Sequence, residues 1–238
     1  MSLWDRFGTA DGDSHVTPTE VRPSRVIDEL KARLKKMTRP QLLDLGHTSG
    51  LNIDFFVRLG CKVHVDDYIT TVLQWRASVP TPAPDNGQSR RGPGTVVRHS
   101  GQAARSKSRV LISPLDYETA QFDAVLCWDL FDYFPPEAAV QAGREIRRLT
   151  REGGLLFGLF GRRQDRVARA PRRFRIMPEG LQADDVEGPQ ACPFYLASRD
   201  VQKIFADFEM SQTVLLKDGA REMLLRKKTA TSRQRPLI

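Results

Sequence analysis

Apolar residues recur along this chain with two different periods, and each period predicts one kind of element. Val26, Leu30, Leu34 and Met37 are separated by four, four and three positions, which places them on one face of an amphipathic helix over residues 24–37. Short apolar runs that end at turn residues predict buried strands instead. The strands expected on this basis are residues 41–45, 62–65, 110–112, 122–128 and 155–160.

Further helices are expected between and after these strands. One follows residues 41–45 and is closed by Gly60 in the C-cap position. The next opens at Pro135 and Pro136, because proline is well tolerated in the first turn of a helix. Another is capped by Ser198. The residues expected on the inward faces are Ile53, Phe56, Val57 and Leu59, then Ala139, Ala142, Ile146 and Leu149, then Val201, Ile204, Phe205 and Phe208.

The alternation of strand and helix up to residue 160 predicts an α/β fold, a doubly wound, mostly parallel sheet with helices on both faces. The chain ends differently. Residues 210–216 and 222–226 are apolar runs separated by the turn Lys217-Asp218-Gly219, which is typical of a β-hairpin. We therefore expect the sheet to finish in a C-terminal antiparallel β-hairpin.

The same pattern divides the chain into one domain and three loosely organised segments. Residues 1–22 are polar and aperiodic and are interpreted as a flexible tail, and residues 229–238 as a basic tail. Residues 77–108 are dominated by Pro, Gly, Ser and Arg and are interpreted as a disordered insertion. The single domain is expected to cover residues 23–228, a size that one hydrophobic core can support.

Composition is that of a soluble globular protein, with 40% hydrophobic and 28% charged residues. No apolar run is long enough to span a bilayer, and the first residues lack the pattern of a secretory signal. The three cysteines are far apart, and the four histidines are scattered without ligand spacing. We therefore expect no disulfide framework, no metal site, no membrane partner and a cytoplasmic location.

The net charge of +8 is concentrated in a few segments. Residues 76–109 and 162–175 each hold seven basic residues and one Asp, and residues 226–238 hold five basic residues and no acid. Clustered Arg attracts nucleic acid or acidic partners. Because none of these segments interleaves aromatic residues for base stacking, solvated loops are the favoured interpretation and nucleic acid is not the favoured partner.

The segment Leu42-Leu43-Asp44-Leu45-Gly46-His47-Thr48-Ser49-Gly50 carries the main chemical signal. An apolar strand ends in an acid and a glycine-bearing turn, and a helix follows. Glycine lets a ligand approach the backbone closely, and the start of a helix offers free N–H groups. This arrangement is typical of a nucleotide-type cofactor site.

These motifs resemble those of the class I S-adenosylmethionine-dependent methyltransferases, which have a Rossmann-like fold. Asp44, Gly46 and Gly50 match the acid, the first glycine and the last glycine of that family's turn, and Thr48 replaces its middle glycine. FDAVLCWD resembles the family's fourth strand, and REGGLLFGLF resembles the glycine pair that leads into its fifth. The resemblance implies S-adenosyl-L-methionine as cofactor and no resident metal.

The resemblance also implies roles for individual residues around the cofactor. Asp44 is expected to support the amino end of its methionine, and Gly46 and Gly50 to allow close approach. Asp66 or Asp67, at the end of the second strand, is expected to accept hydrogen bonds from the ribose hydroxyls, and Asp66 is twenty residues past Gly46. Which of the two does so depends on the strand register.

Further residues are expected near the cofactor or the methyl acceptor. Asp116 is similar in position to residues that touch the adenine, with Leu115 packing on the ring. His47 lies in the cofactor turn, and Trp128 either walls the pocket or packs in the core. His64, by contrast, is expected to be packed in its strand. The candidates for contacting an incoming nucleophile are Asp129, Asp132 and Tyr133, of which Asp129 and Tyr133 are weak catalytic candidates.

The function expected is therefore methyl transfer from S-adenosylmethionine to an unidentified acceptor. Because Thr disfavours positive φ, Thr48 is expected to reshape the turn. One alternative is a non-catalytic member of the family that binds the cofactor or a partner. Others are a nucleic-acid methyltransferase or binder that uses the Arg-rich segments, and an NAD-dependent oxidoreductase, which the missing Gly-x-Gly-x-x-Gly spacing disfavours. Acceptor and oligomeric state stay open.

Overall fold

The computed structural model describes residues 20–78, 114–161, 169–188, 190 and 193–229. The expected tail at residues 1–19 and most of the basic tail lie outside the described residues. So do the strand expected at residues 110–112 and the insertion expected at 77–108, apart from residues 77 and 78.

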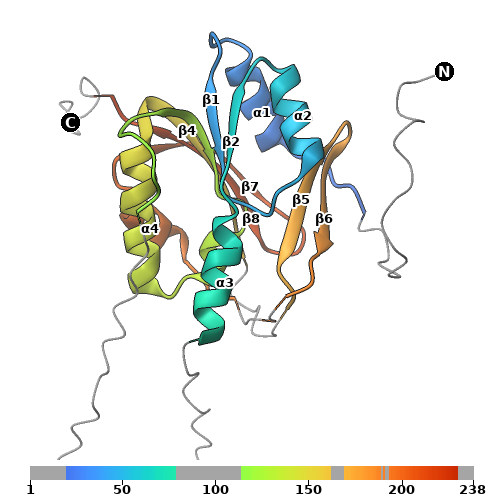
Figure 1. The fold of residues 1–238 in the computed structure, drawn as a ribbon, viewed down its shortest axis with the longest axis vertical. Coiled ribbons are helices and arrows are strands. Elements are labelled where there is room, and N and C mark those ends of the chain that lie inside the picture. The colour runs from blue at the N-terminus through green and yellow to red at the C-terminus, as the bar shows by residue number, and fades with distance from the viewer. Residues whose placement is uncertain (1–19, 79–113, 162–168, 189, 191–192, 230–238) are drawn as a thin grey trace, which may run out of the picture.

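A six-stranded sheet forms the centre of the molecule (Figure 1). Its order is β2-β1-β3-β4-β8-β7, in which β2, β1, β3 and β4 run parallel while β8 and β7 are antiparallel to their neighbours. The predicted fold class, including the terminal hairpin, is confirmed. The strands are β1 (Gln41–Asp44), β2 (Lys62–Val65), β3 (Phe122–Leu126), β4 (Thr150–Phe160), β7 (Phe208–Leu215) and β8 (Arg221–Lys227).

Helices cover both faces of this sheet, as the strand–helix alternation predicts. One face packs against α1 and α2, and the other against α3, α4 and α5 (Figure 1). Helix α3 was not expected, because its apolar side chains do not form a clear stripe. The helices are α1 (Arg25–Leu34), α2 (Gly50–Arg58), α3 (Tyr68–Ser78), α4 (Pro136–Leu149) and α5 (Ser198–Ile204), with a 3₁₀ turn η2 at Leu130–Tyr133.

A second sheet of two antiparallel strands, β5 (Arg172–Met177) and β6 (Gly180–Asp185), lies beside α2 (Figure 1). The expectation that residues 162–175 form a solvated Arg-rich loop is wrong for residues 172–175. Phe174 alternates with Arg173 and Arg175 along β5 and is buried in the core on the α2 face. Period-two alternation of this kind is typical of a half-buried strand.

Three smaller details also differ from the sequence expectations. Ser198 does not cap α5: Ala197 is the N-cap residue, and its N–H donates to the carboxylate of Asp200 at 3.1 Å. Gly153 and Gly154 lie inside β4, which begins at Thr150. Arg22, which was expected to belong to the flexible tail, pairs with Leu181 of β6 in an isolated bridge.

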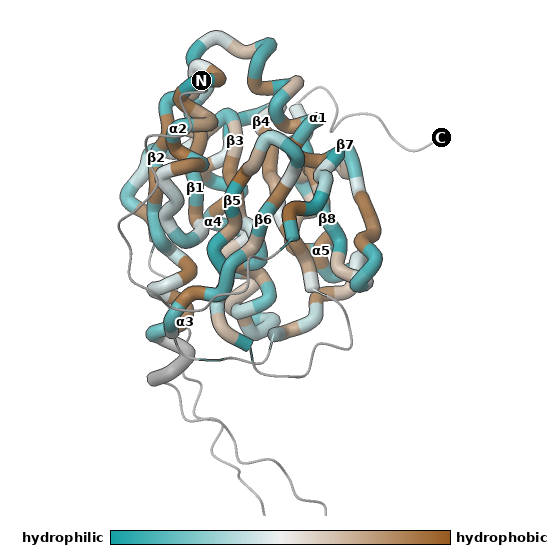
Figure 2. The backbone as a smooth tube through the Cα atoms, turned by 90° about the vertical axis from the view of Figure 1, so that its right-hand side faces the viewer, coloured by the Kyte–Doolittle hydropathy of each residue, from teal (hydrophilic) through white to brown (hydrophobic). Residues whose placement is uncertain are grey.

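Two hydrophobic clusters lie on opposite sides of the sheet. Figure 2 shows hydrophobic residues along the strands of this sheet. Alternate residues of the central strands supply the two clusters: Leu42, Ala124 and Leu126 face α1 and α2, while Leu43 and Val125 face α3 and α4. None of the helices in the described part of the chain is long and apolar enough to cross a membrane.

Candidate functional site

Strands β1 and β3 are neighbours at the point where the order of the sheet reverses. From β1 the chain crosses outward to β2, and from β3 it crosses the other way to β4. In open α/β sheets, ligands bind outside the carboxyl ends of the strands at such a switch point. Here the turn after β1 and the segment after β3 meet at that place.

The turn after β1 is built around the carboxylate of Asp44. The N–H of Gly46 donates to Asp44 Oδ1 at 3.0 Å, and α2 then begins at Gly50. Thr48 is exposed and is not among the described non-glycine residues with positive φ, which are Arg39, Ala120 and Trp128. The replacement of the middle glycine by Thr48 therefore imposes no left-handed backbone on this turn.

Trp128, the second residue after β3, fills the space beside that turn. Its Nε1–H donates to Asp44 Oδ1 at 2.6 Å, and the ring is almost completely buried. A Cβ placed on Gly46 would lie 2.2 Å from Cδ1 of the indole, so only glycine fits at position 46. Trp128 is thus a core residue that packs directly against the turn.

Two phenylalanines hold the indole of Trp128 in this position. The ring of Phe174, from β5, stacks on it with a centroid distance of 5.4 Å and an angle of 2° between the planes. The ring of Phe157, from β4, meets its edge at 5.4 Å. The backbone of Trp128 has φ 45°, a left-handed conformation that is costly for a bulky side chain.

The buried carboxyl group of Asp44 has an unusual protonation equilibrium. Burial raises its pKa to about 6, against the opposing hydrogen bonds from Trp128 and Gly46, and the charge of Asp67 raises it further. A carboxylate held beside a bound cation would have a lowered pKa instead. In this arrangement the carboxyl group of Asp44 accepts hydrogen bonds from the protein itself, from Gly46 and Trp128.

The two aspartates after β2 have different surroundings. Asp67 accepts the N–H of Thr70 at 3.2 Å, in the first turn of α3, and lies 3.3 Å from Nδ1 of His47. Asp66 is half-buried, and no described residue donates a hydrogen bond to its carboxylate. Burial and the charge of Asp67 raise the pKa of Asp66. Asp66 is therefore the member of the pair with free acceptor capacity.

His47 and His64 lie in different environments. The ring of His47 is buried; its Nδ1 is 3.3 Å from Thr70 Oγ1, while its Nε2 has no hydrogen-bond partner among the described residues. The ring of His64 packs edge-on against Tyr117 and Phe122, as expected for a residue inside a strand. Only His47 presents an unsatisfied nitrogen at the turn.

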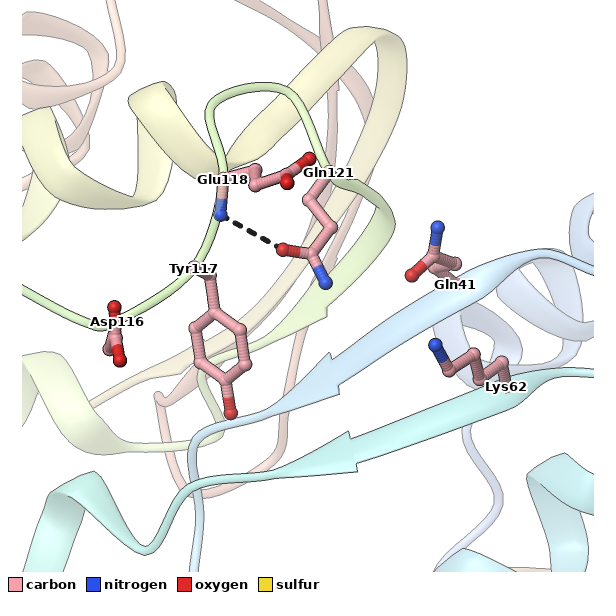
Figure 3. A pocket seen from close by; sticks show the side chains of 6 residues that line it. All are labelled: Gln41, Lys62, Asp116, Tyr117, Glu118 and Gln121. Carbon is pink, nitrogen blue, oxygen red and sulfur yellow. Dashed lines mark hydrogen bonds between the residues drawn. The ribbon is translucent and has the colours of Figure 1, made fainter.

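Asp116 lines a hollow of about 540 Å³ beside β1 and β2, together with Gln41, Lys62 and Tyr117 (Figure 3). The hollow is not lined by the glycine turn, and no described contact joins Asp116 to that turn. Leu115 is buried in the core on the α4 face, and this differs from the expected packing on an adenine ring. The adenine contact of Asp116 stays a prediction.

The nucleophile candidates after β3 are engaged by arginines that lead into β5. Asp129 Oδ2 accepts from Nη2 and Nε of Arg172 at 2.9 and 3.1 Å. Asp132 accepts from Arg169 at 2.9 Å, and burial together with the charge of Asp129 raises its pKa to about 7. Burial also raises the pKa of Tyr133. Asp129 and Asp132 thus hold the arginines that lead into β5, while Asp129 Oδ1 and the hydroxyl of Tyr133 have no hydrogen-bond partner among the described residues.

Cysteines and possible metal ligands are the other reactive side chains that the structure describes. The described cysteines, Cys61 and Cys127, are buried, and burial raises the pKa of each thiol. Among the residues that the structure describes, no group of His, Cys, Asp and Glu could hold a metal ion.

Comparison with known proteins now adds to this geometry. Residues 93–158 match a family model described as a methyltransferase domain. The resemblance to the class I S-adenosylmethionine-dependent methyltransferases is confirmed. A search of curated proteins finds no match.

Solved structures of methyltransferases are similar to this chain at low identity. One from Mesorhizobium loti is 12% identical with a TM-score of 0.47, over 84% of this chain and 96% of that one. One from Methanosarcina mazei is 12% identical with a TM-score of 0.46, over 87% and 99%. The 1,6-didemethyltoxoflavin-N1-methyltransferase of Burkholderia thailandensis, with bound S-adenosylhomocysteine, is 14% identical with a TM-score of 0.41, over 91% and 97%.

The residues at the switch point fit the nucleoside half of the expected cofactor but not its methionine half. Asp66 and the unpartnered Nε2 of His47 offer polar atoms that a nucleoside can use. The carboxylate of Asp44, which was expected to support the amino end of the methionine, accepts from Trp128, and the indole also fills the space over Gly46. While Trp128 stays there, the methionine half does not fit.

Sequence reasoning missed the residues that hold Trp128 and the neighbouring strand β5 in place. Phe174 stacks on Trp128, Arg172 pairs with Asp129, and Asn52 of α2 bonds the backbone of β5. The alternation Arg173-Phe174-Arg175-Ile176 was the available signal, because it indicates a strand with one apolar face.

Proposed function

We propose that this chain is an S-adenosylmethionine-dependent methyltransferase acting on an unidentified acceptor. The observation that carries the proposal is the switch point itself: Asp44 ends β1 and a glycine turn follows it, and Asp66 follows the adjacent parallel strand β2. This is the place at which an open α/β sheet binds a nucleotide-like ligand. The methyltransferase match over residues 93–158 supports the same activity.

Asp66 and the turn would hold the nucleoside end of the cofactor. A carboxylate accepts hydrogen bonds from both ribose hydroxyls, and Asp66 has no competing donor among the described residues. Asp67 instead caps α3 and contacts His47. We therefore assign the ribose to Asp66 rather than to Asp67.

When bound, S-adenosylmethionine supplies a methyl group on a sulfonium leaving group, so the protein needs chiefly to align the acceptor and exclude water. A general base is required only for an acceptor that must lose a proton. The carboxylate of Asp129 is paired with Arg172 and is therefore not a free general base. The general base would have indicated the acceptor class, so that class stays open.

Calorimetric titration with adenosine and with S-adenosylhomocysteine tests the cofactor assignment. Asp66→Ala combined with Asp67→Ala should weaken adenosine binding more than tenfold, because hydrogen bonds to charged groups contribute about 1.5–3 kcal/mol. Asp66→Ala alone should produce most of the loss, and Asp67→Ala less than about threefold. Asp54→Asn, at an exposed position of α2, is the matched control.

An unchanged dissociation constant in the double variant would remove the ribose assignment. A screen of candidate acceptors with methyl-labelled cofactor then tests transfer itself. Label found on no acceptor class, despite measurable cofactor binding, would contradict the catalytic part of the proposal.

One observation favours a second function, that of a non-catalytic domain that binds an adenosine-containing ligand. Trp128 fills the space over Gly46. A domain of this kind would bind adenosine tightly and S-adenosylhomocysteine no better, and it would show no turnover.

A further inference from the structure

The feature that the proposed function leaves unexplained is the indole at the switch point. Trp128 is 2% exposed, bonded to Asp44 and in close contact with Gly46. The resemblance assigns Asp44 to the amino end of the methionine and Gly46 to the close approach of the cofactor, and Trp128 occupies both positions. The nucleoside half, at Asp66, is not involved in them.

The stacking partner of Trp128 belongs to an element outside the main sheet. Phe174 is part of β5, which is hydrogen-bonded only to β6 among the described strands. Asn52 holds β5 against α2: its Nδ2 donates to the carbonyl of Phe174 at 2.9 Å, and its Oδ1 accepts the N–H of Ile176 at 2.8 Å. The position of the hairpin therefore determines how firmly Trp128 is held.

We propose that Trp128 competes with the methionine half of the cofactor for the crevice, and that the β5–β6 hairpin sets the cost of displacing it. This rests on the proposed function, because it concerns the same crevice. The full cofactor binds after the stack between Trp128 and Phe174 separates. A nucleoside without the methionine binds with the stack intact.

Two features make displacement feasible. The left-handed backbone at Trp128 is strained, so a change of conformation there releases energy that the packing now offsets. The hairpin can also shift without breaking the ladder of the six-stranded sheet, because its own pairing is separate. The affinity for the full cofactor is then reduced by the fraction of molecules in which the crevice is open.

The test compares the dissociation constants of S-adenosylhomocysteine and adenosine across variants. Trp128→Ala should tighten S-adenosylhomocysteine binding at least tenfold and leave adenosine binding within twofold. Phe174→Ala, which keeps Trp128, should tighten S-adenosylhomocysteine binding about threefold and decides the question if Trp128→Ala does not fold. Phe205→Ala removes a buried ring from the opposite face of the sheet and should change neither constant.

Hydrogen exchange on the wild-type protein provides a second measurement. Saturating S-adenosylhomocysteine should speed amide exchange in residues 172–177, because the stack must separate, and adenosine should not. No acceleration, or slower exchange, would overturn the proposal.

The outcomes separate this inference from the proposed function. If the wild type and both variants bind S-adenosylhomocysteine with equal, measurable affinity, Trp128 does not compete with the methionine half, and the proposed cofactor binding still stands. Equal tightening for adenosine also overturns it, because the effect would then not concern the methionine half. Failure of every variant to bind either compound would defeat both proposals.

Discussion

Asp44 shows how one residue can serve two arrangements of the same crevice. In this structure its Oδ1 accepts from Gly46 and Trp128, and burial raises the pKa of its carboxyl group to about 6. The cationic amino group of a bound methionine would favour the charged form instead. The protonation state of Asp44 is therefore coupled to what lies beside it.

Replacing Asp44 by Asn should change how stability depends on pH. The folded-state pKa of about 6 lies above the ordinary value of 3.8, so the stability that this group contributes is complete below about pH 4 and is lost as the pH rises through 6. The loss corresponds to about 3 kcal/mol. Urea unfolding measures this: between pH 4 and pH 8 the free energy of unfolding of Asp44→Asn should rise relative to that of the wild type by about the same amount.

Asp54→Asn, which changes an exposed carboxylate, serves as the comparison and should keep the wild-type profile. Parallel profiles for the wild type and Asp44→Asn would contradict the assignment of the raised pKa to Asp44.

At the scale of elements, the β5–β6 hairpin depends on few attachments to the rest of the molecule. Asn52 supplies two hydrogen bonds from α2, Arg172 pairs with Asp129, and Leu181 is bridged to Arg22. Elements with few attachments open at lower free energy than the core. Because β5 pairs only with β6 among the described strands, the hairpin can move without breaking the ladder of the six-stranded sheet.

Asn52→Ala should loosen the hairpin selectively. It leaves the carbonyl of Phe174 and the N–H of Ile176 without their buried partner, at a cost of about 3 kcal/mol. Thermal unfolding measures the loss, and faster amide exchange confined to residues 172–185 locates it. Val57→Ala, on the exposed side of α2, should have little effect; an equal loss there would show that the helix rather than the hairpin is disturbed.

The elements that the sequence predicts well are those whose pattern and end signals agree. Lys62–Val65 forms a strand as expected, and Gly60 closes α2 with φ 85°. The hairpin was missed because three of the six residues of β5 are arginines, although Arg172 pairs with the buried carboxylate of Asp129. The role of Trp128 could not be foreseen, because it depends on a left-handed backbone and on a residue 46 positions later in the chain.

Across the whole molecule, the first described residues join three separate parts of the fold. The backbone of Arg22 exchanges two hydrogen bonds with Leu181 of β6, at 2.9 and 2.7 Å. Its guanidinium group pairs with Glu222 of β8, which is fully buried and also accepts from Ser24 Oγ at 2.8 Å. Gly180 has no room for a Cβ where the backbone of Arg22 passes.

Arg22→Ala should lower the free energy of unfolding by about 3 kcal/mol, because it leaves the buried charge of Glu222 without its cation. Adding Glu222→Gln should recover part of that loss. Chemical denaturation of the two variants provides the measurement, with Arg25→Ala, an exposed neighbour, as the control. A loss below about 0.5 kcal/mol would mean that water or another group already compensates Glu222.

The burial of Trp128 gives the crevice a built-in optical signal. The chain has three tryptophans, so replacing Trp4 and Trp75 by Phe would leave this indole as the sole tryptophan, which can be excited selectively over the four tyrosines. Shielded from solvent and stacked on Phe174, it emits at short wavelength, and on release into water its spectrum shifts to the red. Opening can then be followed in real time, without a dye and without knowledge of the methyl acceptor.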